Sequence, residues 1–81
     1  MARSRQRIQV LAGSLRFVRG QRDFSQERLA NAVGVTPGMI ALIETGRRQP
    51  GRPLLDRMAA VLDVTPDVLA FIDDDTEESA A

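Results

Sequence analysis

The amino-acid sequence predicts an all-α fold, with five helices around one compact core. Apolar residues recur at helical spacings of three and four between about residues 8 and 72, and residues that start or end helices separate these runs. No strand pattern is evident, so no β-sheet is expected. A chain of 81 residues forms one small domain with a modest core.

The first helix is expected to run from about Arg5 to Gly20. Four apolar residues at successive spacings of three, four and three form its core stripe: Ile8, Leu11, Leu15 and Val18. Val10 and Phe17 lie seven positions apart on a second face. A loop then carries Phe24, which we expect to fill the core ahead of the next helix.

Two short helices joined by a tight turn are expected next, over about 25–33 and 36–45. Each follows a residue whose side chain can cap a helix N-terminus: Ser25 and Thr36. Each ends at a glycine, which tolerates positive φ: Gly34 and Gly46. Two helices of this length and turn have the geometry of a helix-turn-helix, whose second helix lies in the major groove of DNA.

The C-terminal part is expected to form helices over about 52–62 and 66–72, with Pro53 and Pro66 in their first turns. Five acids in six positions follow, a composition typical of disorder. The expected organisation has three parts: a basic N-terminal arm at 1–7, a helix-turn-helix DNA-binding domain at 8–72 and a disordered acidic tail at 73–81.

Sixteen positions resemble, in register, the Cro and phage-repressor type of helix-turn-helix protein, the XRE family, over roughly residues 11–72. They are Arg19, Gln26, Leu29, Ala30, Gly34, Val35, Ile40, Ile43, Glu44, Gly46, Arg47, Arg48, Pro50, Ala59, Leu62 and Val64. The resemblance implies a lambda-repressor-like domain that binds double-stranded DNA. It also implies that Gln26 contacts the DNA backbone, and that Arg19 and Glu44 form a structural ion pair between the first and third helices.

The charges of the chain are strongly segregated. All eleven basic residues are arginines within residues 1–57, a segment with four acids and a net charge of +7, whereas the remainder holds seven acids and no base. This asymmetry predicts a nucleic-acid-binding face, although segregation for solubility would look the same. The chain has no His, Cys, Tyr or Trp, so we expect neither an enzyme nor a metal or cofactor site.

Four residues are expected to contact DNA phosphates: Gln26, Arg47, Arg48 and Arg52. Gln26 lies in the first turn of its helix, where exposed backbone N–H groups also attract phosphate. Arg47 and Arg48 follow the third helix and would neutralise phosphates, or simply satisfy the C-terminus of that helix. For Gln26 and Arg52 the alternative is a solvated side chain.

The outward positions of the third helix are expected to meet the bases or the groove: Thr36, Pro37, Gly38, Met39, Ala41, Leu42 and Thr45. None is an Arg, Lys, Asn or Gln, the residues that usually bind base edges. Readout could be apolar and indirect, through DNA bending. It could instead come from a minor-groove arm, with Arg3, Arg5 and Arg7. A third alternative is that Met39 and Leu42 form a protein-contact patch.

We expect a symmetric homodimer on a palindromic operator, because two recognition helices then meet successive major-groove faces ~34 Å apart. The candidate interface residues, placed on the last helix, are Leu69, Phe71 and Ile72. Alternatively, Leu69 and Ile72 complete the core of the monomer, and Val10 and Phe17 are the next candidates. The acidic tail either competes with phosphate for the Arg-rich face or serves only solubility.

Two classes of function therefore remain open. The first is a sequence-specific transcriptional regulator of the repressor, controller or antitoxin type. The second is a protein-interaction module, such as an adaptor or anti-repressor partner. No apolar run approaches the ~20 residues of a membrane span, and no signal peptide is evident. We therefore expect a cytoplasmic, nucleoid-associated protein of a bacterium or phage, with no membrane or small-molecule partner.

Overall fold

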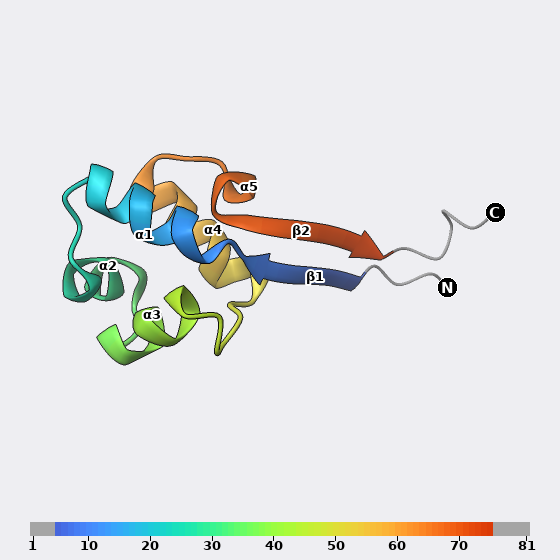
Figure 1. The fold of residues 1–81 in the computed structure, drawn as a ribbon, viewed down its shortest axis with the longest axis horizontal. Helices are drawn as coiled ribbons and strands as arrows, with labels where there is room; N and C mark the ends of the chain where they lie inside the picture. The colour runs from blue at the N-terminus through green and yellow to red at the C-terminus, as the bar shows by residue number, and fades with distance from the viewer. Residues whose placement is uncertain (1–4, 76–81) are drawn as a thin grey trace.

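The computed structural model describes residues 5–75, and their side chains from residue 7 to residue 73. Five helices form the body of the molecule (Figure 1): α1 (Ala12–Gln21), α2 (Gln26–Val33), α3 (Pro37–Glu44), α4 (Arg52–Leu62) and α5 (Pro66–Leu69). Strand β1 (Arg5–Val10) precedes them and strand β2 (Ala70–Asp75) follows them. The predicted five-helix domain is confirmed, and the two strands are additional.

Strand β1 corrects the expected start of the first helix. It pairs with β2 in antiparallel fashion, with Val10 opposite Ala70, Ile8 opposite Ile72 and Arg7 opposite Asp73. The helix therefore begins at Ala12 instead of near Arg5. Ile8 lies at helical spacing from the apolar residues of α1, so the sequence pattern also fits a longer helix. The strand that pairs with β1 lies at the other end of the chain, where the local pattern around Ile8 cannot reveal it.

Strand β2 corrects the expected acidic tail and last helix. Helix α5 ends at Leu69, and residues 73–75 continue β2 instead of starting a disordered tail. These acids can be held in a strand because β1 offers backbone partners and carries Arg5 and Arg7 in the facing positions. The rest of the predicted tail, with Glu77 and Glu78, lies outside the described residues, as does Arg3.

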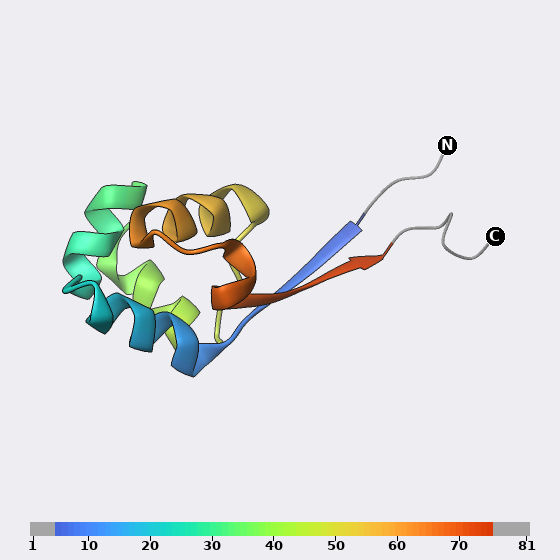
Figure 2. The ribbon, with the colours of Figure 1, turned by 90° about the horizontal axis from the view of Figure 1, so that it is seen from above.

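The two strands form a ribbon that projects from the helical body, away from α2 (Figures 1 and 2). Two hydrogen bonds fix its base. The N–H of Leu11 donates to the carbonyl of Leu69 at 2.9 Å, and the N–H of Val10 donates to Oε1 of Gln49 at 2.8 Å. The ribbon is thereby joined both to α5 and to the loop between α3 and α4.

The core lies between the helices and the base of the ribbon. Its largest fully buried side chains come from all five helices: Leu15, Leu29, Ile40, Ile43, Leu55, Met58, Leu62 and Leu69. Val10 and Ala70 close it where the ribbon begins. Phe24 packs against it from the loop, as predicted, whereas Leu11 of the expected stripe is exposed.

The turn between α2 and α3 follows the sequence prediction. The hydroxyl of Ser25 accepts a hydrogen bond from the N–H of Arg28 at 3.0 Å, and that of Thr36 accepts one from Met39 at 3.2 Å. Gly34 ends α2 with φ of 80°, a left-handed conformation that a side chain would disfavour. These local signals set the angle at which α3 leaves α2.

Candidate nucleic-acid interface

Helix α3 presents a small, largely apolar outer face. Ile40, Ile43 and Glu44 point inward and are buried. Among the predicted outward positions, Leu42 is 40% exposed and the residues of the first turn are exposed, whereas Met39 and Ala41 are half-buried. Met39 in fact packs against the core, so it is less outward than its sequence position predicts.

The threonine hydroxyls at the two ends of α3 are already engaged within the helix. Thr36 caps the N-terminus, and Oγ1 of Thr45 donates to the carbonyls of Ala41 at 3.2 Å and Leu42 at 3.1 Å. A hydroxyl that accepts from its own helix, as in Thr36, or donates to it, as in Thr45, has less to offer to a base edge. The outer face of α3 is therefore suited to apolar contacts more than to hydrogen-bonded readout.

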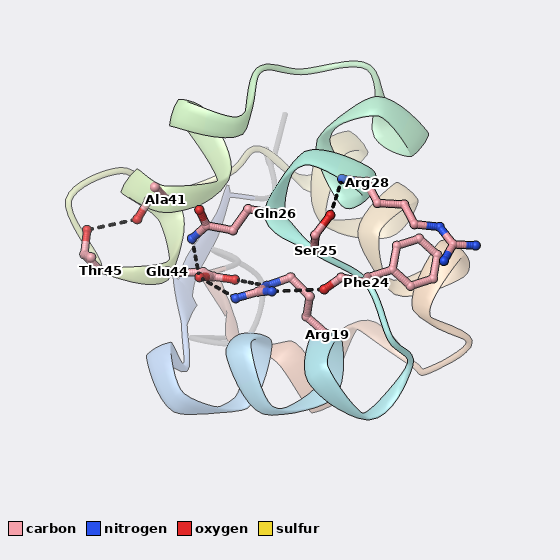
Figure 3. A network of polar contacts seen from close by, with 8 residues as sticks. All are labelled: Arg19, Phe24, Ser25, Gln26, Arg28, Ala41, Glu44 and Thr45. Atoms are coloured by element: carbon pink, nitrogen blue, oxygen red, sulfur yellow. Dashed lines mark hydrogen bonds and ion pairs between the residues drawn. The ribbon is translucent and has the colours of Figure 1, made fainter.

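A buried ion pair holds α3 against α1, as the family resemblance implied (Figure 3). Nε of Arg19 donates to Oε2 of Glu44 at 2.6 Å, and a second guanidinium nitrogen lies 3.3 Å from Oε1. The third nitrogen donates to the carbonyl of Phe24 at 2.9 Å. Glu44 is only 9% exposed, so this pair is a structural brace instead of a base-reading group.

The amide of Gln26 belongs to the same network. Its Nε2 donates to Oε1 of Glu44 at 2.9 Å, so it bridges the start of α2 and the end of α3 (Figure 3). The buried carboxylate therefore orients Gln26, the residue for which the sequence predicts a phosphate contact. Its exposure is intermediate, and the second N–H of Nε2 and the amide oxygen extend the hydrogen-bonding capacity of Gln26 beyond this bond.

An open hollow of about 700 Å³ lies beside this network. Residues of α1, α2 and α3 line it: Arg16, Arg19, Ser25, Gln26, Glu27, Pro37, Ala41, Glu44 and Thr45. Arg16 was not among the sequence-predicted site residues, although it precedes Arg19 by three positions and so shares its helix face. Its exposed cationic side chain adds positive charge to the hollow beside α2 and α3.

Arg47 and Arg48 extend the basic surface beyond the C-terminal end of α3. Both are exposed, and their backbone N–H groups donate to the carbonyl of Leu42 at 2.9 and 3.2 Å. The positive φ of Gly46, 78°, allows the chain to fold back in this way. Arg52 differs, because its Nε is 2.8 Å from Oδ1 of Asp56 in an exposed pair within α4.

Three further arginines serve the fold. Nε of Arg22 donates to the carbonyl of Leu62 at 2.9 Å, and Nε of Arg57 donates to that of Val33 at 3.2 Å, so both satisfy helix C-termini. The guanidinium of Arg28 lies 4.7 Å from the centre of the Phe24 ring. The net charge of the basic segment therefore overstates the number of arginines that are free to meet phosphate.

The predicted dimer residues fall in different environments. Leu69 is fully buried in the core of its own chain, so it is not available to a partner. Phe71 and Ile72 lie on β2, and their expected placement on a helix is wrong. Ile72 is half-buried against the core, whereas Phe71 is 61% exposed. Only Phe71 of the three is a free apolar side chain.

Other kinds of site find no support in the described part of the chain. Residues 5–75 contain no group of three acidic, His or Cys side chains placed to hold a metal ion. Over the same residues, every helix is too short or too polar to cross a membrane.

The capped pair α2–α3, its left-handed turn and the brace to α1 together define a helix-turn-helix domain. A helix-turn-helix family model matches residues 15–69, and the protein belongs to this family of XRE-type, DNA-binding transcription regulators. A comparison with curated protein sequences gave no significant match.

Solved structures resemble a large part of this chain. The clp gene regulator ClgR of Corynebacterium glutamicum is 30% identical, with a TM-score of 0.68, over 72% of this chain and 63% of that chain. The restriction-modification controller protein C.AhdI of Aeromonas hydrophila is 28% identical, with a TM-score of 0.67, over 70% of this chain and 86% of that chain. The two strands of the ribbon lie outside the family match at 15–69.

Proposed function

We propose that the protein is a sequence-specific transcriptional regulator that binds double-stranded DNA as a homodimer on a palindromic operator. The observation that carries the proposal is the placement of cations beside and beyond α3. Arg16 lines a hollow whose other residues include Pro37 and Thr45, at the two ends of α3, and Arg47 and Arg48 follow the helix. A helix flanked by cations in this way can lie in a major groove while the arginines neutralise nearby phosphates.

The similarity to known regulators supports the same class. ClgR is described as a clp gene regulator and C.AhdI as a restriction-modification controller, and they resemble 72% and 70% of this chain, respectively. A regulator of this kind acts by binding instead of catalysis, in the compartment that holds the DNA. Among the more specific types, the controller type has a structural parallel in C.AhdI.

Base readout in this proposal relies on the apolar outer face of α3 and on DNA shape. Leu42 offers its methyl groups to thymine, and Arg16, Arg47 and Arg48 fix the register on the backbone. The minor-groove arm is no longer the favoured source of specificity, because Arg5 and Arg7 lie in a strand paired with β2. Indirect readout through sequence-dependent bending supplies the remainder.

Selection of bound sequences from random duplex DNA, followed by binding at increasing salt, tests the proposal. A symmetric consensus should emerge, and affinity should fall with a slope of about −0.9 per phosphate neutralised. Arg48→Ala should weaken binding to all sequences and make the slope shallower by about one phosphate. Arg57→Ala is the matched control, because Arg57 caps α2.

A second candidate function is a protein-interaction module, which the exposure of Leu42 favours. In that case no consensus would emerge, and Arg48→Ala and Arg57→Ala would affect DNA binding equally. A flat salt response at low ionic strength would reject the regulator in favour of this module.

A further inference from the structure

The register of the two strands determines which side chains share a face. At the base of the ribbon, the N–H of Leu11 donates to the carbonyl of Leu69, whereas the N–H of Val10 donates to Gln49. Because side chains alternate along a strand, Val10 and Ile8 share one face with Ala70 and Ile72 opposite them. That face turns toward the core. The other face carries Arg7, Gln9, Phe71 and Asp73, and we call it the Phe71 face.

The Phe71 face has the composition of a contact surface. Phe71 is 61% exposed, and it borders a hollow of about 340 Å³ lined by Arg7, Ile8, Gln9, Gln49, Phe71 and Asp73. A large apolar side chain surrounded by polar groups is typical of the centre of a protein–protein interface. A two-stranded ribbon is also marginally stable by itself, so an additional packing layer would stabilise it.

The charges on this face fit a second copy of the same chain. Arg7 and Asp73 face each other across the ribbon beside Phe71, so among the side chains that the structure describes the face carries one charge of each sign. A two-fold axis brings the same patch of both chains together, and such a patch must complement itself. A face with one base and one acid does so, whereas a strongly acidic or basic foreign surface would meet a like charge.

Pairing through the strand edges is less favourable. An edge contact about a two-fold axis joins β1 to β1 or β2 to β2. The first arrangement brings together two strands that carry Arg5 and Arg7, and the second brings together two runs of three aspartates at 73–75. Like charges in facing strands are destabilising. Gln49 also occupies the outer edge of β1 at Val10.

We propose that the protein dimerises by packing the Phe71 face of the ribbon against the Phe71 face of a second copy. This inference rests on the proposed function, because that function includes a dimer on the operator. The inference adds the surface through which the dimer forms. Gln49 lines the hollow and directly follows Arg48, so the contact also reaches the loop that carries the phosphate-binding arginines.

Sedimentation of the full chain without DNA, over a range of concentrations, tests the surface. Phe71→Asp should lower the apparent mass to that of a monomer while the circular dichroism remains helical. Phe17→Asp is the matched control, because Phe17 is 64% exposed on α1, and this variant should remain dimeric. A wild-type chain that is monomeric at about 100 μM, or dimeric Phe71→Asp, would overturn the proposal.

A charge-reversal pair tests the contact between chains independently of folding. Arg7→Asp gives a face with two acids, and Asp73→Arg gives a face with two bases, so each variant alone should be monomeric. Mixed together, the two variants should form a heterodimer. A dimer that forms only on mixing must be held by contacts between chains, because residues 7 and 73 still repel each other within each chain.

Failure of the mixture to associate, with both variants folded, would show that this face is not the interface. DNA binding by the same samples separates this result from the proposed function. Variants that remain dimeric and bind DNA would locate the dimer elsewhere and leave the regulator intact. A dimer that behaves as expected but binds no DNA at low salt would uphold the interface and reject the regulator.

Discussion

Nε of Arg19 lies 2.6 Å from Oε2 of Glu44, and this contact joins the first helix of the domain to its recognition helix. Both side chains are largely buried, and the remaining donors of Arg19 reach Oε1 of Glu44 and the carbonyl of Phe24. The position of α3 therefore depends on a charged pair whose two members are satisfied only in each other's presence.

Removing one member of this pair should strongly destabilise the domain. Glu44→Ala leaves the Arg19 guanidinium largely buried without its carboxylate, and we expect a loss of about 3–5 kcal/mol in the free energy of unfolding. Chemical denaturation measures the loss. Asp56→Ala is the control, since it breaks an exposed pair with Arg52 that has a similar distance of 2.8 Å and should cost about 1 kcal/mol or less. Equal losses in the two variants would contradict the bracing role.

The melting temperature should depend on the charge of the side chain at Gln26 more than on its size. Its Nε2 donates to Glu44, so Gln26→Glu places a carboxylate against a carboxylate and should lower the melting temperature more than Gln26→Ala does. Both variants should bind DNA less tightly. If Gln26→Glu melted at the wild-type temperature, the hydrogen bond to Glu44 would not be important for stability.

Thymine methyl groups under α3 should contribute to affinity. Replacing the thymines of the selected operator by deoxyuridine removes only these methyls, and each one that packs against Leu42 should cost about fourfold in affinity, from ~0.8 kcal/mol per buried carbon. Leu42→Ala should abolish the difference between the two DNAs. Phe17→Ala, which changes an exposed side chain on α1, should preserve it. An operator indifferent to the methyls would leave DNA shape as the source of specificity.

Gln49 should protect the amide of Val10 from solvent exchange. Gln49→Ala removes the acceptor at 2.8 Å and leaves a partly buried N–H unpaired, at a cost of about 1–3 kcal/mol. Gln49→Glu retains an oxygen in place and should restore most of the protection. Hydrogen exchange measured by NMR at Val10, with Leu11 as the internal reference, follows both effects. Rapid exchange at Val10 in the wild type would show that the contact does not persist in solution.

The helix-turn-helix was predictable from sequence because its signals are local. Ser25, Gly34 and Thr36 act on neighbouring backbone groups, and the structure has them in the predicted roles. The pairing of Arg19 with Glu44 was predictable only through the family resemblance, since 25 positions separate them. Neither source identified Arg16, whose importance depends on how α1 lies against α2 and α3.

The ribbon was not predicted because its partners lie at opposite ends of the chain. The alternation of Ile8 and Val10 is too short to distinguish a strand from a helix by periodicity. The acids at 73–75 look disordered in isolation, and only the facing strand with Arg5 and Arg7 makes their extended conformation favourable. The charge composition indicated a basic face and an acidic segment. It did not indicate that Arg5 and Arg7 pair with residues of the acidic segment in neighbouring strands.

The ribbon also has a consequence for the order of folding. Pairing Val10 with Ala70 closes a loop of sixty positions, between residues 10 and 70, at an entropic cost of about 4 kcal/mol. The helices have local contacts and should form first, bringing the ends together before the strands can pair. Weakening the ribbon should therefore speed unfolding and leave the refolding rate unchanged. A newly made chain would thus acquire its recognition helix before the surface through which we propose that it finds its partner.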